Sequence, residues 1–408
     1  MKNERLLTIC FLFMLFCNAT VTYKPAIDCD LQALGRQAVR TEPQAGGSRQ
    51  KAFEHPGVLF NEKDFARMRR YITDTASIAY SSYQLLKAHR FSQSDYSMRG
   101  PFEVISRDGE FRYTKDRMES DFHAVYQNAL MWALTKDEKH ALKSLEILSA
   151  YADMLQTIPE TNDAPLLAGL EGFKIICAME ILKHTYFDPK DTASGQQSQK
   201  IEHIFRSVFI PVIENFYRRP PYTNGNWGAI VTKTYMAAGI YFDDREMYER
   251  AKNFYLNGRD NGTIVYYIDD ETGQTQESGR DQAHAQLGIG AMAVVCELAW
   301  KQGDELYSAL NNRLMKGYEY VARYNLGYDD VPFKQWTDVT GKYNDWTVIS
   351  DRARGQLRPI FEIAHNHYVN RKKLKMPYTE QVLQKIRPEN FNGDQPPAFG
   401  SLLFRQAK

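Results

Sequence analysis

The chain has 408 residues, enough for one large domain or two ordinary domains with a sizeable core. Its 51 lysines and arginines nearly balance its 50 aspartates and glutamates. The net charge of +1 gives no global field for nucleic acid, so no nucleic-acid partner is expected. Aromatic residues make up 13% of the chain. Some of them are expected in the hydrophobic core, and sugar-binding clefts also use aromatic faces, so this content is a weak sign of sugar binding.

The N-terminus has the pattern of a bacterial secretory signal. Lys2 and Arg5 precede an apolar run from Leu6 to Cys17, and small and polar residues follow. The run is too short for a stable membrane span, and no later stretch is long and apolar enough to cross a bilayer. We expect residues 1–22 to be a cleaved signal peptide and the protein to be periplasmic or on the cell surface. A lipoprotein is not favoured, because bulky Phe16 stands before the cysteine where a small residue is required.

The rest of the chain shows no linker and no low-complexity segment. Its cysteines are few and odd in number, which does not suit a disulfide framework. Cys177 and Cys296 lie in apolar helical patterns that predict core positions. We expect three further parts, namely an N-terminal arm (23–55), one helical domain (56–390) and a C-terminal tail (391–408).

Helical periodicity dominates the domain. The predicted helices are 62–89, 117–135, 137–156, 163–186, 197–218, 226–241, 244–257, 280–302, 304–325, 351–370 and 378–386. Short links make neighbours antiparallel, and helices that are apolar on most faces, such as 163–186, are expected to be buried on two sides. The predicted fold is all-α: an α/α toroid, an incomplete barrel of six or seven helical hairpins, with one minor β-hairpin at Thr263–Ile268.

The stretch from Gln274 to Gly303 begins polar and ends apolar. We expect a helix capped by Ser278, with Asp281 three residues later as in a short capping box. Arg280 and His284 are four residues apart and share one helix face, where a cation and an imidazole can bind an anion and move a proton. The alternative is a capped surface helix with a satisfied histidine.

A second cluster, Tyr222–Gly228, opens the predicted helix 226–241. Asn224 or Asn226 can cap that helix, and this alone explains one asparagine. Two asparagines beside Trp227 at a helix N-terminus also suit a sugar carboxylate, because the helix start favours negative charge and the indole stacks on the ring.

Two further pairs are weaker signals. His123 and Tyr126 share one helix face, and a hydrogen-bonded core pair is favoured over an acid or base pair. Arg354 and Arg358 are predicted to share another helix face, either as a solvated basic surface or as a clamp for carboxylates. The irregular link 331–349 is a further candidate, because long loops in compact domains are often functional.

Several chemistries lack their motifs in this chain. No H-E-x-x-H, Walker A, G-x-S-x-G or strand-linked G-x-G-x-x-G is present. His365 and His367 alone are a weak metal signal. No metal and no cofactor are expected.

The stretches QESGRDQAHAQLGIGA and NGNWGA together resemble the alginate lyase superfamily, the helical-toroid polysaccharide lyases of gut and soil bacteria. Within it the chain is most similar to the family 38 type of uronan lyase from Bacteroides-like organisms. Stretches such as NDAPLLAGLEGF and RGQLRPIFEIAHNHY extend the likeness over about residues 55–380. The best-known members carry an Asn-His pair and a tyrosine after an arginine. Here Asn226-Trp227 stands at the first position and His284 follows Arg280, so the tyrosine lies elsewhere or His284 has taken part of its role.

The resemblance implies β-elimination on a polyuronate, alginate first and glucuronan next, with unsaturated uronate ends as product. Asn226 and Arg280 are implied to neutralise the carboxylate beside the C5 proton. For proton transfer, His284 is the first candidate and His123 the second. The candidate phenols are Tyr126 and Tyr343. The residues expected to bind neighbouring sugars or to orient these groups are Asn224, Trp227, Glu277, Gln282, Gln286, Tyr343, Arg354 and Arg358.

Two other function classes remain open. A glycoside hydrolase on acidic oligosaccharides needs two opposed carboxylates, for which Asp121, Asp163, Glu277 and Asp281 are available. A non-catalytic glycan-binding protein of the cell surface would release no product, and it would carry the lipidated cysteine that Phe16 disfavours.

Overall fold

The computed structural model describes residues 51–188, 190–393 and 397–406. The expected signal peptide (1–22) and residues 23–50 of the expected arm lie outside this part of the chain. The α-helices of the described residues are α1 (Glu62–Tyr71), α2 (Ile78–Ala88), α3 (Lys115–Thr135), α4 (Glu138–Met154), α5 (Ala164–Thr185), α6 (Thr192–Ile204), α7 (Ile210–Arg218), α8 (Gly225–Tyr241), α9 (Arg245–Asn257), α10 (Ile264–Tyr267), α11 (Gln282–Lys301), α12 (Ala309–Asn325), α13 (Phe361–His365), α14 (Pro377–Ile386) and α15 (Gly400–Leu403).

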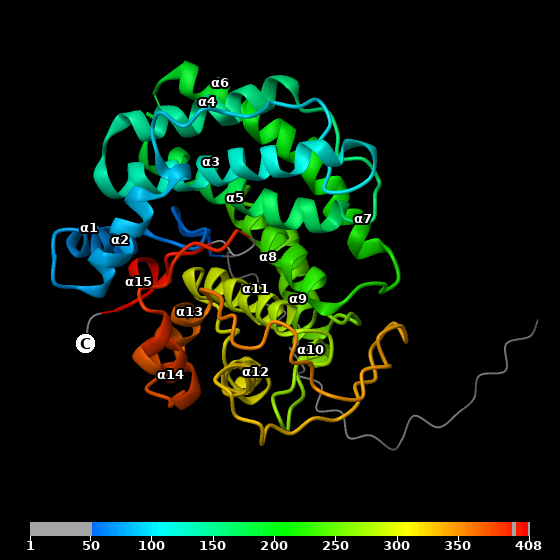
Figure 1. The fold of residues 1–408 in the computed structure, drawn as a ribbon. Helices are drawn as coiled ribbons and strands as arrows, with labels where there is room; N and C mark the ends of the chain where they lie inside the picture. The colour runs from blue at the N-terminus through cyan, green and yellow to red at the C-terminus, as the bar shows by residue number, and fades with distance from the viewer. Residues whose placement is uncertain (1–50, 189, 394–396, 407–408) are drawn as a thin grey trace, which may run out of the picture. The chain divides into compact units, whose positions relative to one another are not determined.

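The helices between residues 115 and 386 form two layers (Figure 1). In the inner layer, α3 packs on α5, α5 on α8, α8 on α11 and α11 on α13. In the outer layer, α4 covers α3, α7 covers α5, α9 covers α8, and α12 covers α11. The inner helix α5 is buried at almost every position from Ala164 to Leu182, which explains why its sequence is apolar on most faces. The predicted all-α toroid is confirmed.

The helix starts follow local capping chemistry. Asp137 caps α4 through the Lys139 N–H, and Asp244 caps α9 through the Met247 N–H at 2.9 Å. These caps satisfy N–H groups that the helix itself leaves without partners. They explain why the predicted starts of these two outer helices lie within one residue of the observed ones.

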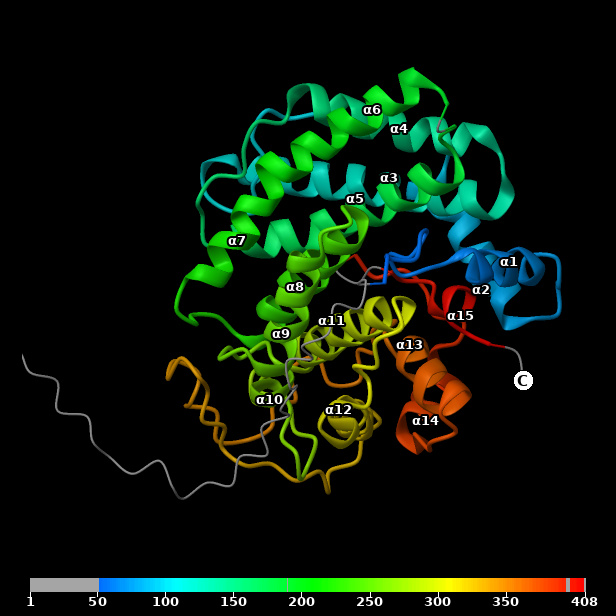
Figure 2. The same ribbon diagram turned by 180° about the vertical axis from the view of Figure 1, so that it is seen from behind.

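The ring of helices is completed by segments far apart in the sequence. α15 packs against α1 and α2, and α1 packs against α3 (Figure 2). Arg67 of α1 donates through Nη2 to the carbonyl oxygen of Leu403, and Ser82 of α2 lies 3.4 Å from the carbonyl oxygens of Glu389 and Phe399. The expected C-terminal tail therefore contributes a buried element to the toroid.

The predicted helix 62–89 is two helices, α1 and α2, separated by the non-helical residues 72–77. Three further predicted elements are wrong. The β-hairpin at Thr263–Ile268 is the short helix α10, and one bridge between Ile268 and Thr275 is all that remains of strand pairing there. Thr263 accepts the Tyr267 N–H at 2.8 Å, which turns the aromatic run inward instead of extending it. The predicted helix 351–370 begins only at Phe361, because Pro359 removes a backbone donor just before it.

The third error concerns the helix that begins near residue 280. Its N-cap is Asp281, whose carboxylate accepts the His284 N–H at 2.8 Å, and the helix starts at Gln282. Ser278 instead accepts the Thr275 N–H at 3.0 Å through its hydroxyl. Arg280 therefore lies outside the helix, and it does not share a helix face with His284 as predicted.

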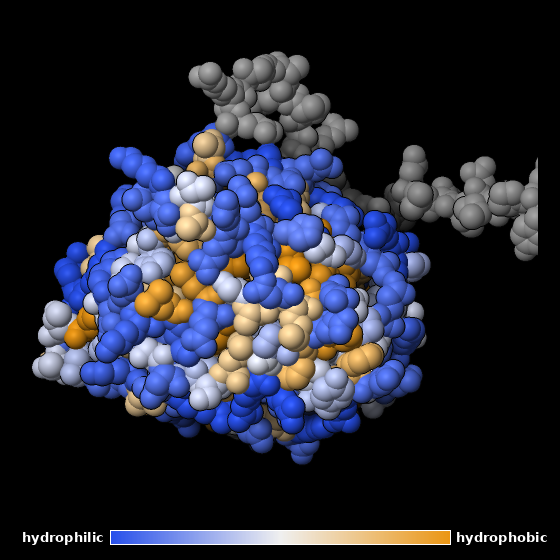
Figure 3. Space-filling model, turned by 90° about the horizontal axis from the view of Figure 1, so that it is seen from above, coloured by the Kyte–Doolittle hydropathy of each residue, from blue (hydrophilic) through white to orange (hydrophobic). Residues whose placement is uncertain are grey.

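One helix of the described residues, Gln282–Lys301, is long and apolar enough to cross a membrane by length and composition. Its most apolar window is 83% buried within the fold, as expected for a core helix. Figure 3 views the face that carries α4 and α6 and shows apolar side chains dispersed among polar ones. Leu142 and Met154 of α4 are among the exposed apolar side chains.

Candidate active site

Glu277 lies at the centre of the cluster formed by the two stretches singled out in the sequence. Its side chain is fully buried and accepts four hydrogen bonds. Oε1 accepts from Asn226 Nδ2 at 2.7 Å and from Arg280 Nη1 at 2.8 Å. Oε2 accepts from the Asn226 N–H and from the Tyr267 hydroxyl, both at 3.0 Å. One carboxylate therefore joins the start of α8 to the segment before α11.

The two asparagines at the start of α8 do not cap the helix through their side chains. Asn224 occupies the N-cap position, but its side chain makes no capping hydrogen bond. The Gln276 side chain caps the helix instead. Gln276 Oε1 accepts the Gly225 N–H at 3.0 Å, and its Nε2 donates to Asn224 Oδ1 at 3.1 Å. Asn226 is fully buried, and its Oδ1 has no hydrogen-bond partner among the described residues. A sugar carboxylate can touch Asn226 only if the groups covering it move.

Gly225 permits the close approach on which this cluster depends. A Cβ atom at Gly225 would lie 2.2 Å from Tyr267 Cδ2 and 2.3 Å from the carbonyl oxygen of Asn261. The same tyrosine fills the space beside Gly288 of α11, where its hydroxyl would be 2.0 Å from an added Cβ. The Tyr267 ring of α10 therefore packs between α8 and α11, and its hydroxyl donates to Glu277.

His284 and Asp281 form a carboxylate–imidazole pair at the start of α11. Nδ1 of His284 lies 2.7 Å from Asp281 Oδ2, and the His284 side chain is 36% exposed. Burial acts to raise the pKa of Asp281, but hydrogen bonds from the His284 ring and N–H and the nearby charge of Arg280 lower it to about 2. The ionised carboxylate orients the imidazole through Nδ1, and Nε2 has no hydrogen-bond partner among the described residues.

Arg280 is held between these two carboxylates. Beyond its bond to Glu277, its Nε lies 3.8 Å from Asp281 Oδ2, and its side chain is 28% exposed. Nη2 makes no hydrogen bond within the described part of the chain. A guanidinium that two carboxylates hold in place, and that keeps one NH₂ group without a partner, can bind a further carboxylate.

The irregular link 331–349 lies against this cluster. Trp346 packs on Gly279, where an added Cβ would be 2.4 Å from the tryptophan Cβ, and its ring stacks on Tyr343 at 5.9 Å between centroids. The Tyr343 hydroxyl lies 3.4 Å from the carbonyl oxygen of Tyr222. Burial raises the pKa of this phenol, and the positive charge of Arg280 acts in the opposite direction. Asn261 anchors the link through Asp338 at 2.8 Å.

His123 and Tyr126 are placed in the core, away from Glu277. His123 is 6% exposed, and its Nε2 lies 3.1 Å from Lys174 Nζ, which in turn is paired with Glu171. Burial lowers the pKa of His123 well below its ordinary value and raises that of Tyr126 well above it. Neither side chain is open to a polymer, so their assignment to catalysis is corrected to a structural one.

Four predicted sugar contacts are instead tethers of the chain. Gln282 donates to the Ser350 carbonyl oxygen at 3.0 Å, and Gln286 accepts the Arg358 N–H at 2.9 Å. Both glutamines are at most 1% exposed. Arg354 donates to the carbonyl oxygen of Tyr324 at 2.9 Å and pairs with an aspartate, and Arg358 lies 3.3 Å from an asparagine oxygen. Because residues 351–360 are not helical, the two arginines do not form the predicted clamp.

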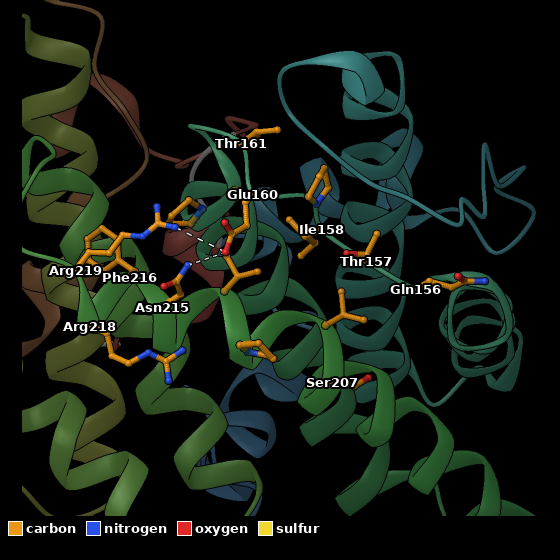
Figure 4. A pocket seen from close by; sticks show the side chains of 16 residues that line it. Gln156, Thr157, Ile158, Glu160, Thr161, Ser207, Asn215, Phe216, Arg218 and Arg219 are labelled. Carbon is orange, nitrogen blue, oxygen red and sulfur yellow. Dashed lines mark hydrogen bonds and ion pairs between the residues drawn. The ribbon is translucent and has the colours of Figure 1, made fainter. Parts of the chain in front are cut away.

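A pocket of about 320 Å³ lies between the link from α4 to α5 and helix α7 (Figure 4). Asn215 Nδ2 donates to Glu160 Oε1 at 3.3 Å, and Arg219 Nη2 lies 3.8 Å from the same oxygen. Arg218 lines the pocket as well. The sequence analysis missed these residues, and the Arg-Arg-Pro-Pro run just before Tyr222 was the available signal.

Known proteins resemble this chain in sequence pattern and in fold. The family model described as Alginate lyase matches residues 61–331. Among solved structures, a tetrasaccharide complex of alginate lyase A1-III aligns with a TM-score of 0.62 and 13% identity, covering 88% of this chain and 98% of that one. An alginate lyase from Bacteroides ovatus aligns with a TM-score of 0.53 and 15% identity, covering 87% and 100%. Alginate lyase A1-III from Sphingomonas species A1 aligns with a TM-score of 0.53 and 12% identity, covering 85% and 100%. No curated protein matches the sequence.

Proposed function

The chain belongs to the alginate lyase family and is a polysaccharide lyase, and on that premise we propose that it cleaves a polyuronate, alginate first, by β-elimination. The observation that carries the proposal is the presence of an Asp281-oriented imidazole and a Glu277-oriented guanidinium, each three residues after its carboxylate in sequence. A polyuronate presents a carboxylate and an acidic proton on adjacent atoms, which matches a cation beside a base.

The first requirement of the reaction is to neutralise the uronate carboxylate. Removing the C5 proton places further negative charge on that group, so a fixed cation lowers the barrier more than a mobile one. Arg280 meets this need, because Glu277 and Asp281 hold it in place while Nη2 remains available. Asn226 supports the guanidinium indirectly, through their shared bond to Glu277.

The second requirement is proton transfer. We assign the base to His284 Nε2, which takes the C5 proton while the electrons of that C–H bond form the C4=C5 double bond. The C4–O4 bond breaks, and O4 leaves with a proton from the Tyr343 phenol. Water then returns a proton to the phenol. Trp227, half-buried at the start of α8, supplies an apolar face for a neighbouring ring. The Arg218 and Arg219 pocket can take a more distant uronate.

Three of the four carboxylates considered for a hydrolase are otherwise engaged. Glu277 and Asp281 are buried and paired with Arg280 and His284, and Asp121 accepts hydrogen bonds from two backbone N–H groups and two tyrosines in the core. A general acid must be protonated, whereas the pKa of Asp281 is about 2. This favours elimination over hydrolysis.

The test uses the purified protein with polymannuronate, polyguluronate and glucuronan in separate reactions. The ultraviolet absorbance of the conjugated unsaturated uronate should rise on at least one polymer, with and without chelator. His284→Gln should lower the rate on that polymer by two orders of magnitude or more, roughly the effect of losing a general base. His203→Gln, a change at an exposed histidine of α6, should leave it unchanged.

Other outcomes would replace the proposal. Reducing ends without absorbance would identify a hydrolase, and binding without either product would identify a glycan-binding protein. Export is part of the same proposal, and it predicts a mature N-terminus close to residue 23 when the protein is recovered from the periplasm or the cell surface.

A further inference from the structure

A second cluster of ionisable side chains lies at the other end of the inner helices. Glu180 and His184 stand four residues apart near the C-terminus of α5, His55 belongs to the segment before α1, and Asp243 follows the end of α8. Asn226 is at the beginning of α8, and a helix of 17 residues spans about 25 Å, so this cluster is far from the candidate active site.

The four side chains converge within hydrogen-bonding range. His55 Nδ1 lies 2.8 Å from Glu180 Oε1, and His55 Nε2 lies 3.2 Å from Asp243 Oδ1. His184 Nε2 lies 3.5 Å from Glu180 Oε2. The two imidazole rings stack with their centroids 4.6 Å apart. One nitrogen from each histidine and one Glu180 oxygen can all lie within 4.8 Å of one another.

Glu180 is the unusual member of the cluster. Its side chain is fully buried, and Oε1 is satisfied by the Gly57 N–H at 2.7 Å in addition to His55. Oε2 has no hydrogen-bond partner among the described residues. A buried carboxylate oxygen without a partner is costly, so it requires a ligand or a cation.

The spacing of the unsatisfied oxygen from His184 suits a metal better than a hydrogen bond. At 3.5 Å the Oε2–Nε2 separation is too long for a good hydrogen bond. Two ligands of a tetrahedral zinc ion, each bound at about 2.0–2.1 Å, lie roughly 3.3–3.4 Å apart. A small movement of the His184 ring, whose side chain is 25% exposed, brings its nitrogen into that geometry.

We propose that Glu180 Oε2, His184 Nε2 and His55 Nδ1 form a binding site for a divalent transition metal, zinc first, with water as the fourth ligand. Two imidazoles and one carboxylate form a ligand set that zinc accepts. Asp243 then takes the second role common at such sites: it accepts a hydrogen bond from His55 Nε2–H and so directs Nδ1 toward the metal.

The metal would fasten residue 55 to the C-terminal end of α5. The two histidines and Glu180 come from segments more than a hundred residues apart, so one ion would cross-link the entry of the chain to an inner helix. At about 25 Å from Asn226 the ion takes no part in proton transfer, and the expected effect is on stability.

The test measures zinc binding to the full chain after chelator treatment and dialysis. Isothermal titration should show one Zn²⁺ bound per chain, and Zn²⁺ should raise the Tm in a concentration-dependent way. His184→Gln should weaken binding at least about 100-fold and abolish the Tm shift, whereas His203→Gln should behave as wild type.

A milder variant keeps the test decisive if His184→Gln folds poorly. Asp243 is an exposed residue with a positive φ of 55°, a conformation that asparagine tolerates, so Asp243→Asn should fold normally and weaken zinc binding about 10- to 100-fold. Absence of stoichiometric zinc binding to wild type, or equal affinity in wild type and both variants, would overturn the proposal. Circular dichroism on each variant separates lost binding from lost folding.

Discussion

The substitution Glu277→Gln removes the negative charge that holds the candidate active site together while nearly preserving the side-chain shape. Glu277 accepts hydrogen bonds from the Asn226 N–H and side chain, from Arg280 and from Tyr267. Glutamine offers one oxygen and one NH₂ group, so in either orientation the NH₂ group faces donors. The better orientation places NH₂ toward Tyr267, whose hydroxyl can turn to accept, but the backbone N–H of Asn226 is then left without a partner.

The expected loss of stability follows from these contacts. A buried N–H without a partner costs about 1–3 kcal/mol. The ion pair with Arg280 is partly exposed, so screening by solvent limits its contribution to about 1 kcal/mol. Glu277→Gln should therefore lower the free energy of unfolding by about 2–4 kcal/mol. Because Arg280 then faces a neutral oxygen in place of its charged anchor, and the Asn226 N–H loses its acceptor, kcat should fall by about 10²–10³, the effect of losing one oriented donor to a developing anion.

The assay follows the unsaturated product by ultraviolet absorbance at a temperature where urea titration shows each variant to be fully folded. Glu297→Gln is a matched control, because Glu297 is also a fully buried glutamate, held by Arg371 and by the Tyr307 hydroxyl. It lies near the other end of α11 and should lose stability while kcat stays near wild type. If folded Glu277→Gln kept kcat within about threefold of wild type, the anchoring role of Glu277 would be wrong.

Three further changes test neighbouring parts of the structure. Asp281→Asn keeps an N-cap but removes the carboxylate from His284 Nδ1; stability should change by less than about 1 kcal/mol, and the pH–rate profile should shift with kcat reduced about 10–100-fold. Gly279→Ala should raise KM several-fold without unfolding the protein, because the new methyl group must displace Trp346, and KM on the cleaved polymer checks this. Burial and a neighbouring buried carboxylate raise the pKa of Glu389, so the folded protein keeps a proton that the unfolded chain releases above pH of about 4.3. The stability contributed by this group therefore falls as pH rises above that value, and Glu389→Gln should flatten the decline in urea titrations between acid and mildly alkaline pH.

The helices were predictable because their cause is local. The apolar circumference of 163–186 predicts a helix buried on both sides, which is how α5 lies in the structure. The run Thr263–Ile268 has strand-forming residues, yet it is helical because Tyr267 must reach into the space beside Gly225 and Gly288. That requirement comes from helices distant in sequence, so no local pattern reports it.

The site was predictable in its residue types and less so in their roles. The orienting role expected of Glu277 agrees with its contacts, whereas Gln282 and Gln286 bind backbone groups of residues about seventy positions away. A glutamine at a helix start can bind either a sugar or a backbone carbonyl group. Which of the two it meets depends on the path of the later chain. The sequence analysis paired Asp281 with Ser278 in a capping box, although an aspartate three residues before a histidine can also orient the ring.

The closure of the ring by α15 bears on the order in which the protein can acquire its structure during synthesis. Ser401 and Leu402 are fully buried, and α15 joins α1 and α2, which were made more than three hundred residues earlier. Until residues near 400 emerge from the ribosome, the apolar faces of the first helices lack their final cover. A nascent chain of this kind leaves its first helices without their final cover, and available to chaperones, while more than three hundred further residues are made. The proposed export agrees with this property, because a chain that crosses a membrane unfolded must remain unfolded until it has crossed.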